Sequence, residues 1–142
     1  KKSLISRGPE AEKRLLSDLE RFKTGGLADH LIETESGLKL FFHKKTDAYK
    51  PKTGDKVSVN YVGALMSGQV FNNSFESGEP FEFVIGEQRV IEGWEEIFTE
   101  ISEHSSFTLI VPSEMGYGAS GEPGKIPENA DLIFYIELEK IN

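Results

Sequence analysis

The sequence predicts an α+β domain in which an antiparallel β-sheet surrounds one short helix, with a further helix near the N-terminus. Three observations support this fold class. Several segments between residues 38 and 138 alternate apolar and polar side chains, the period of a strand with one buried face. One segment among them, residues 90–101, has helical spacing instead. Turns and loops, and not repeated helices, join the strands, as is typical of antiparallel sheets.

The N-terminal helix is predicted over Pro9–Lys23, because proline suits the first turn of a helix and the stretch from Thr24 to Gly26 ends the pattern. Its apolar residues recur at helical spacing: Leu15, Leu16, Leu19 and Phe22. Residues 1–8 show no pattern and are expected to be loose. The apolar stripe needs a surface to pack on. Three surfaces remain open: the chain's own domain, a second copy, or a neighbouring domain.

Six strand segments are predicted from alternation or from the hairpin return. In chain order they are residues 38–42, 56–65, 70–71, 81–85, 106–111 and 132–138. A turn at Met66–Gly68 makes the second and third a hairpin. Residues 46–55 and 72–79 are predicted as loops, and residues 28–36 carry a weak signal, helical or irregular.

The short helix over residues 90–101 carries the only tryptophan of the chain, Trp94, in its first turn. Apolar residues recur there at steps of three and four, and Glu95 and Glu96 are predicted on the solvent side. A lone tryptophan on such a face is more often a core residue than a site residue. Residues 112–131, rich in glycine and proline, predict a long loop, which in a compact domain is usually functional or disordered. Tyr117 and Ile126 within it favour an ordered flap over disorder.

The composition narrows the function classes. A chain of 142 residues fits one domain, and its formal net charge of −8 argues against nucleic acid and anionic membrane surfaces as partners. The absence of cysteine excludes disulfides, thiol nucleophiles and zinc sites with sulfur ligands. No apolar run approaches the roughly 20 residues that span a bilayer, and no signal peptide is visible.

The usual catalytic motifs are missing or out of context. Residues 116–121, Gly-Tyr-Gly-Ala-Ser-Gly, match a dinucleotide-binding fingerprint, but Pro123 and Pro127 exclude the helix that must follow it. The three histidines lie in separate segments, so no metal site is predicted, and no cofactor is expected. Glu95 and Glu96 are interpreted as a solvated helix face and not as a catalytic pair. An enzyme with this sequence would work without a strong acid, base or nucleophile.

Short motifs over residues 38–142 resemble, in order and spacing, the FKBP family of peptidyl-prolyl cis/trans isomerases. The motifs are Asn60-Tyr61-Val62-Gly63, Val70-Phe71, Pro80-Phe81-Glu82-Phe83, Gly86, Val90-Ile91-Glu92-Gly93-Trp94-Glu95-Glu96, Gly116-Tyr117-Gly118, Ile126-Pro127 and the stretch from Leu132 to Leu138. Each motif alone is weak, but their joint order is specific. The resemblance implies a half-barrel sheet curled around the short helix. It divides the chain into an N-terminal helical extension, residues 1–37, and an isomerase domain, residues 38–142.

The resemblance also implies a shallow pocket with Trp94 as its floor. The residues expected in its walls are Tyr61, Phe71, Phe81, Val90, Ile91, Tyr117, Ile126 and Phe134. Isomerisation of an Xaa-Pro bond in protein clients is the implied activity. The proline ring would lie on Trp94 among Phe81, Val90 and Ile91. The ring edges of Tyr61, Phe71 and Phe134 would face the substrate carbonyl. The Ile91 N–H and the Tyr117 hydroxyl would hold the peptide.

Three departures from the family pattern bear on activity. Asn72 stands where the family usually has an aspartate paired with the pocket tyrosine, here Tyr61, so lower turnover and macrolide affinity are expected. Ile97 replaces a usual glycine, and Glu122 and Lys125 change the polarity of the flap. Binding of proline-containing peptides without efficient turnover is therefore one alternative. A purely structural domain is another, if the flap covers the rings.

The expected partners are proline-containing polypeptides and macrolides such as rapamycin, with no nucleic acid, and a homodimer through residues 9–23 is one reading of the N-terminal helix. The chain begins at Lys1 without a methionine, which favours a trimmed or mature fragment. The lysine-rich start and the lack of cysteine favour a bacterial periplasm or cell envelope, with the cytoplasm as the alternative.

Overall fold

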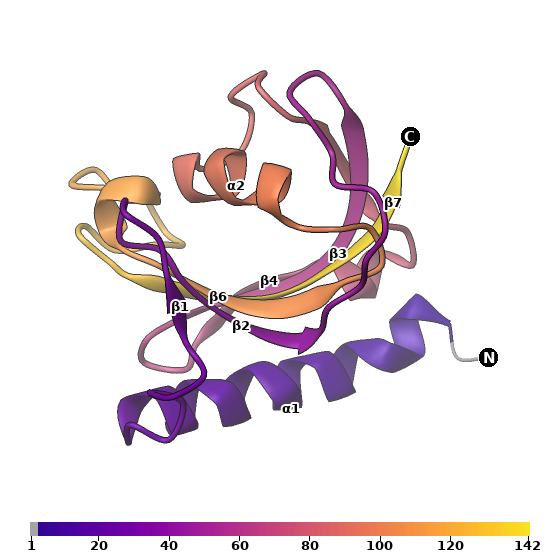
Figure 1. Ribbon diagram of the computed structural model, residues 1–142. Helices are drawn as coiled ribbons and strands as arrows, with labels where there is room; N and C mark the ends of the chain where they lie inside the picture. The colour runs from indigo at the N-terminus through magenta and orange to yellow at the C-terminus, as the bar shows by residue number, and fades with distance from the viewer. Residues whose placement is uncertain (1–2) are drawn as a thin grey trace.

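The computed structural model describes residues 3–142 and shows three layers, with helix α1 on one side of a curved sheet and helix α2 on the other (Figure 1). The strands are β1 (Ile32–Glu33), β2 (Lys39–Lys44), β3 (Lys56–Leu65), β4 (Val70–Asn73), β5 (Phe81–Val84), β6 (Ser106–Val111) and β7 (Leu132–Ile141). The helices are α1 (Leu4–Lys23) and α2 (Glu92–Ile97), with short 3₁₀ helices η1 (Ser74–Ser77), η2 (Phe98–Glu100) and η3 (Ser113–Met115).

The sheet has seven strands in the order β1-β2-β6-β7-β3-β4, and β5 pairs with the free half of β3. All pairs are antiparallel. An open antiparallel sheet around a short helix confirms the predicted fold class. Strand β1 was not predicted, because two residues are too few to show a period in the weakly patterned stretch 28–36.

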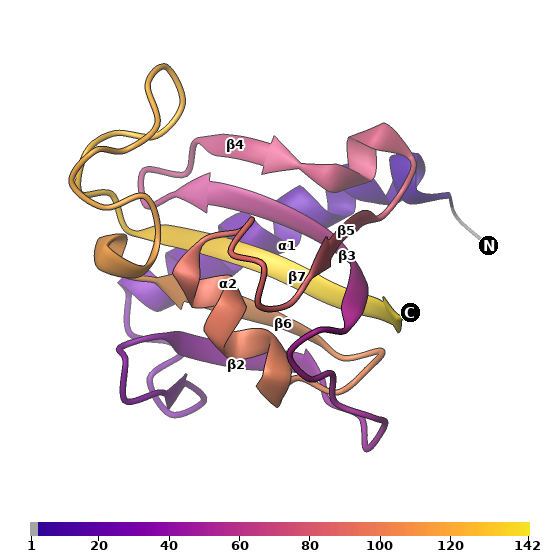
Figure 2. The ribbon, with the colours of Figure 1, turned by 90° about the horizontal axis from the view of Figure 1, so that it is seen from above.

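The inner face of the sheet holds the main core. Helix α2 crosses this face (Figure 2), and its first and last turns bury Trp94 and Ile97 against the central strands. The central strands β3 and β7 contribute Val57, Val59, Phe134, Ile136 and Leu138 to this core. The predicted helix over 90–101 is shorter as an α-helix, since it begins at Glu92 and continues beyond Ile97 as the 3₁₀ turn η2.

Helix α1 begins five residues earlier than the predicted Pro9, so the expectation of loose residues is wrong for residues 4–8. The Ser3 hydroxyl caps the helix by accepting a hydrogen bond from the Ser6 N–H at 3.2 Å. Pro9 lies inside the helix, where it donates no backbone hydrogen bond. Gly8 is buried against Phe75, so packing on the domain sustains a first half that local propensity disfavours. Residues 1 and 2 of the predicted loose segment lie outside the described residues.

A second apolar cluster fills the space between α1 and the outer face of the sheet. Leu15 and Leu19 of the predicted stripe are 0% and 3% exposed there, packed with Val62, Ile133 and Phe75. The stripe therefore docks on its own domain. This docking covers the outer face of β3, which carries the polar side chains of the alternating pattern. Asn60 on this face is 2% exposed. Neither helix of the described chain is long and apolar enough to cross a membrane.

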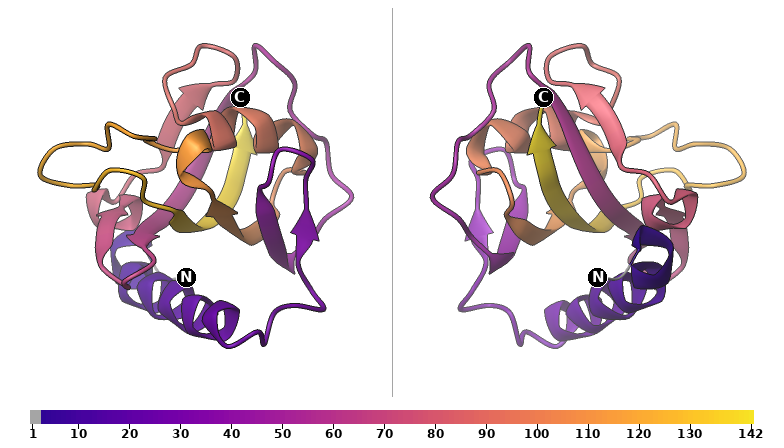
Figure 3. Two further views of the ribbon diagram at one scale, coloured as in Figure 1. Left: turned by 90° about the vertical axis from the view of Figure 1, so that its left-hand side faces the viewer. Right: turned by 90° about the vertical axis from the view of Figure 1, so that its right-hand side faces the viewer.

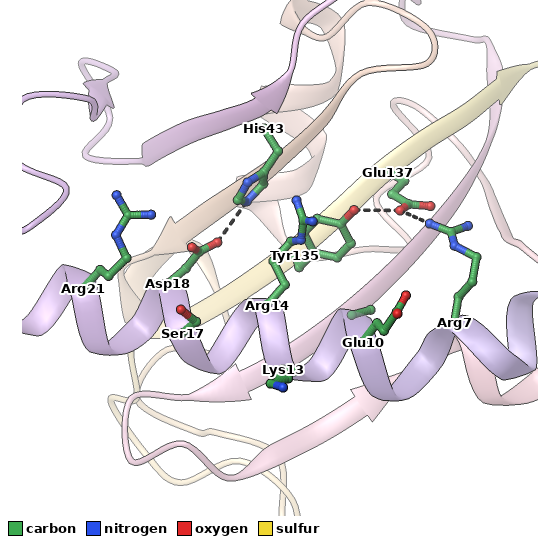
Figure 4. A pocket seen from close by; sticks show the side chains of 11 residues that line it. Arg7, Glu10, Lys13, Arg14, Ser17, Asp18, Arg21, His43, Tyr135 and Glu137 are labelled. Carbon is green, nitrogen blue, oxygen red and sulfur yellow. Dashed lines mark hydrogen bonds and ion pairs between the residues drawn. The ribbon is translucent and has the colours of Figure 1, made fainter.

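Polar contacts align α1 on the sheet (Figure 4). Arg7 pairs with Glu137, and the Tyr135 hydroxyl donates to the same carboxylate at 2.6 Å. About three turns further along, Asp18 accepts from Thr108 at 2.7 Å and lies 2.9 Å from the ring nitrogen of His43. Burial by itself would raise the pKa of Asp18, but the hydrogen bonds and charge of His43 and the Thr108 hydroxyl bring it below its ordinary value. The helix is thus anchored at both ends of its docked face.

Candidate functional site

A small cavity of about 110 Å³ opens beside α2 on the inner side of the sheet, and we call it the ring cavity. It is lined by Tyr61, Phe71, Asn72, Phe81, Arg89, Val90, Ile91, Trp94, Tyr117 and Phe134. The structure therefore brings together every predicted site residue except Ile126. Ile126 is 4% exposed and lines a neighbouring cavity under the flap. Its place in the pocket wall stays a prediction.

The rings of the cavity meet mostly edge to face. The centroid of Tyr61 lies 4.8 Å from that of Trp94 at an interplanar angle of 83°, and Trp94 lies 5.4 Å from Phe134 at 71°. Phe71 meets Phe134 at 5.9 Å and 88°. Such contacts stabilise aromatic pairs beyond their buried area and fix the orientation of each ring. Trp94 is 3% exposed, so it belongs to the core and lines the cavity as well.

Close approach of two of these rings depends on Gly63. This glycine of β3 is paired with Phe134 of β7 and with Asn72 of β4. A Cβ atom at Gly63 would lie 2.8 Å from the rings of both Phe71 and Phe134, a distance that no side chain tolerates. The glycine therefore lets the rings from the two flanking strands close over β3.

The loop that leads into the wall formed by Val90 and Ile91 is held by Glu95. This glutamate lies on the exposed side of α2, as expected, and it also binds the loop. Its carboxylate accepts hydrogen bonds from the backbone N–H groups of Gly86 and Gln88, each at 2.7 Å. A carboxylate that accepts from two amides of one loop stabilises that loop, which here leads into α2. Helical periodicity places Glu95 away from the core, but it cannot show that a preceding loop folds back onto it.

The polar corner of the cavity consists of Asn72 and Tyr61. The Asn72 side-chain amide donates to the Tyr61 hydroxyl oxygen at 2.9 Å. The hydroxyl therefore acts as the acceptor in this pair, and its proton remains available for another partner. Burial, followed by the nearby Tyr117, raises the pKa of Tyr61 to about 12. This corner consequently carries no charge at neutral pH.

The raised tyrosine pKa values predict a loss of stability at alkaline pH. Below about pH 10 Tyr61 is neutral in both states; above it the unfolded chain ionises first, while the folded chain stays neutral up to a pKa of about 12. The unfolded state then binds fewer protons, so the free energy of unfolding falls between these two values. Urea denaturation at about pH 9 and about pH 11 should show a larger fall for the wild type than for Tyr61→Phe. Equal falls in both proteins would contradict the assignment.

One backbone donor and one side-chain donor at the cavity have no acceptor within residues 3–142. The Ile91 N–H stands at the start of α2, where the first helical N–H groups have no partner inside the helix. The Trp94 indole Nε1 is buried without a hydrogen-bond partner. An unsatisfied buried donor is costly, so each one calls for an explanation such as a bound water or a ligand.

Tyr117 and Arg89 complete the rim. Tyr117 extends from the flap after η3, and burial together with the charge of Glu122 raises the pKa of its hydroxyl. The flap projects from the body of the domain (Figure 3), and Phe81 in the cavity wall is 37% exposed. Arg89 lines the cavity with a side chain that is 80% exposed and 3.7 Å from Glu87. Sequence reasoning missed Arg89, because a single charged loop residue carries no pattern.

A larger cavity of about 670 Å³ lies between α1 and the sheet, lined by charged side chains (Figure 4). Several of these, such as Arg7 with Glu137 and Asp18 with His43, are already paired with one another. The ring cavity is smaller but combines apolar walls with a few convergent polar groups, as ligand sites usually do. We therefore take the ring cavity as the candidate site. Within residues 3–142 no group of three or more histidines, aspartates or glutamates is placed to hold a metal ion.

Comparisons with known proteins agree with this geometry. The model of the family described as FKBP-type peptidyl-prolyl cis-trans isomerase matches residues 47–139. FK506-binding protein 1 of Yarrowia lipolytica is 46% identical over 92 residues, which cover 65% of this chain and 85% of that protein. Peptidyl-prolyl cis-trans isomerase FKBP15-2 of Arabidopsis thaliana is 39% identical over 120 residues, covering 84% of this chain and 70% of that protein.

The crystal structure of FkpA from Escherichia coli is similar over 98% of this chain, with a TM-score of 0.75 and 31% sequence identity. The matched part is 62% of the FkpA chain, so this chain spans less than two thirds of that protein. A peptidyl-prolyl cis-trans isomerase from Pseudomonas syringae has a TM-score of 0.75 and 27% identity, covering 92% of this chain and 95% of that one. The matched family model, the curated relatives and the open sheet wrapped around α2 together show that this chain belongs to the FKBP-type peptidyl-prolyl cis-trans isomerase family.

Proposed function

We propose that the ring cavity holds the proline of an Xaa-Pro segment and that the chain, an isomerase of the FKBP type, speeds the rotation of that bond there. As a family member it acts on proline-containing substrates and takes macrolide-type ligands in general. The observation that carries the proposal is the enclosure of a proline-sized apolar cavity by rings from β3, β4, β5, α2, the flap and β7.

The mechanism follows from amide chemistry. Rotation about an Xaa-Pro bond is slow because it breaks amide resonance, with a barrier of about 18 to 20 kcal/mol. The twisted amide is less polar than the planar one, so an apolar cavity stabilises it relative to the ground state. Catalysis is then differential binding of the transition state. The proline ring would lie on the indole of Trp94, between Phe81 and Val90.

Polar groups at the edge of the cavity would orient the peptide. The Ile91 N–H, which has no acceptor in the described chain, is suited to a carbonyl after the proline. The Tyr117 hydroxyl would hold a second carbonyl from the flap side. The edges of Tyr61, Phe71 and Phe134 carry the positive part of the ring quadrupole, so they suit the carbonyl oxygen as it turns out of the amide plane.

The proposal is tested by following cis and trans resonances of a Phe-Pro peptide by NMR. Catalytic amounts of the chain should produce exchange between the two sets of signals, and rapamycin should abolish it. Line broadening that appears only at stoichiometric amounts would show a binding module without turnover. The observation that favours this second candidate is Asn72, since an amide supplies no negative charge at the polar corner.

Asn72→Asp is expected to raise kcat/KM about 3- to 10-fold. An ionised carboxylate would accept from the Tyr61 hydroxyl and fix the ring more strongly than the present amide, which donates to it. Turnover on the same peptide measures the change, with Gln69→Glu as a control that makes the same change from amide to carboxylate at an exposed side chain outside the cavity lining. A kcat/KM equal to or below the wild-type value would show that the amide does not limit turnover.

The predicted homodimer through residues 9–23 stays a prediction. It would use the apolar stripe of α1, yet Leu15 and Leu19 of that stripe are buried against the chain's own sheet. We propose that the chain acts as a monomer, so light scattering should give the mass of one chain.

A further inference from the structure

Helix α1 contacts the segment that carries one wall and the polar corner of the ring cavity. Strand β4 contributes Phe71 and Asn72 to the cavity and continues through Asn73 into η1. The first half of α1 lies against η1 (Figure 3). Phe75 of η1 is fully buried there, with the guanidinium of Arg7 at 5.3 Å from its ring centroid. The support of β4 on its outer side is therefore a helix outside the part that the family model matches.

Asn73 is the link between the helix and the strand. Its side-chain NH₂ group donates to a carboxylate oxygen of Glu12 at 2.7 Å, and its side-chain oxygen Oδ1 accepts from the Phe75 N–H at 3.0 Å. Both polar ends of one side chain are thus engaged, one by α1 and one by η1. A charge-assisted bond of this kind is roughly twice as strong as a neutral one, so it fixes the end of β4 firmly.

The same short segment reaches Tyr61 by two routes. The Ser74 hydroxyl accepts from the Tyr61 backbone N–H at 2.8 Å, and the Asn72 amide donates to the Tyr61 hydroxyl at 2.9 Å. Residues 72, 73 and 74 therefore contact the phenol, the helix and the backbone of β3 in succession. A shift of Asn73 would move both contacts of Tyr61.

We propose that Glu12 is a positioning residue for the ring cavity: through Asn73 it sets where β4 presents Phe71 and Asn72 to Tyr61. Glu12 is not among the residues that line the cavity, so it acts through its partner Asn73. The proposal rests on the proposed isomerase function of the cavity. It gives α1 a part in the activity besides packing.

Glu12→Ala should lower kcat about fivefold and leave KM within about twofold, since misplaced rings lose contacts that matter most in the twisted state. Glu12→Gln keeps an acceptor and should retain most of the activity. Asn73→Asp places two carboxylates together and should be as impaired as Glu12→Ala. Glu12→Gln combined with Asn73→Asp restores a donor and an acceptor with their roles exchanged, and activity should recover.

Arg21→Ala is the matched control, because Arg21 stacks over Phe41 of β2, a strand that gives no residue to the cavity lining. It removes a contact of α1 with the sheet and should leave kcat and KM unchanged. The proposal is wrong if Glu12→Ala keeps wild-type kcat, if the exchanged pair does not recover, or if Arg21→Ala loses as much. Urea denaturation of each variant confirms that folded protein is compared.

Hydrogen exchange gives a readout that does not depend on turnover. The backbone amides of Asn72 and Asn73 should exchange about tenfold faster in Glu12→Ala than in the wild type, while those of β6 stay unchanged. If the wild type shows no turnover, the proposed function fails but this measurement still decides the positioning role. Unchanged exchange in β4 would overturn it.

Discussion

Trp94→Ala is expected to lower kcat/KM for an Xaa-Pro peptide by about two orders of magnitude. The indole lies 3% exposed beneath the ring cavity and meets the rings of Tyr61 and Phe134 within 5.4 Å. Its removal takes away the surface that receives the proline ring and lets the surrounding rings relax. An isomerase assay at saturating and at low peptide concentrations measures the loss.

The control is Phe107→Ala, because Phe107 is fully buried in the same core but is not part of the cavity lining. Both truncations should cost about 3 to 5 kcal/mol of stability. In the fraction that is folded, Phe107→Ala should keep wild-type turnover. If Trp94→Ala does not fold, Trp94→Leu retains apolar volume and should still show a loss of about tenfold. Wild-type turnover in either Trp94 variant would remove the ring cavity from the mechanism.

Leu15→Ala is expected to lower the free energy of unfolding by about 3 kcal/mol and to keep a single unfolding transition. Leu15 is 0% exposed in the cluster between α1 and the sheet, so its truncation leaves a cavity in a shared core. Urea denaturation followed by circular dichroism and by tryptophan fluorescence measures the change. The fluorescence reports on Trp94, on the opposite face of the sheet from α1.

Leu16→Ala is the matched control, since the neighbouring side chain is 37% exposed and should lose less than about 1 kcal/mol. Two separate transitions, or a fluorescence midpoint that Leu15→Ala leaves unchanged, would show that α1 unfolds independently. Such a result would support the predicted division at residue 37. A single shared transition would instead make residues 3–142 one cooperative unit.

The elements that the sequence predicted best are those whose two faces differ in polarity or whose ends carry turn residues. Strand β6 has the predicted bounds, residues 106–111, because Pro112 ends it. Strand β3 has the predicted bounds 56–65, because Gly54 precedes it and Gly68 lies in the turn after it. Strand β7 continues beyond Leu138 to Ile141, where the alternation fades but the pairing with β3 persists.

Most features that the sequence did not show depend on specific contacts that periodicity does not describe. The start of α1 depends on a serine cap and on Phe75, and neither is visible in helical periodicity around Pro9. The role of Glu95 depends on a loop that folds back over the helix start. Local patterns describe which face of an element is apolar, but they do not describe what covers the other face.

The candidate site was predicted largely because the family resemblance placed its residues. Alternation and spacing alone predict strands and a helix whose aromatic side chains face the core. They do not show that these side chains surround one cavity. The structure adds Arg89 to the lining and leaves Ile126 in a neighbouring cavity. The direction of the hydrogen bond from Asn72 to Tyr61 also needed coordinates, since an amide can donate or accept.

The amide at position 72 has a consequence for the conditions under which the protein works. An aspartate beside a phenol would gain a proton as the surroundings become acidic, and the rate would change with it. An asparagine does not titrate, and the partner phenol releases its proton only in strong alkali, near a pKa of about 12. The corner of the cavity therefore keeps one electrostatic state from acidic to mildly basic media.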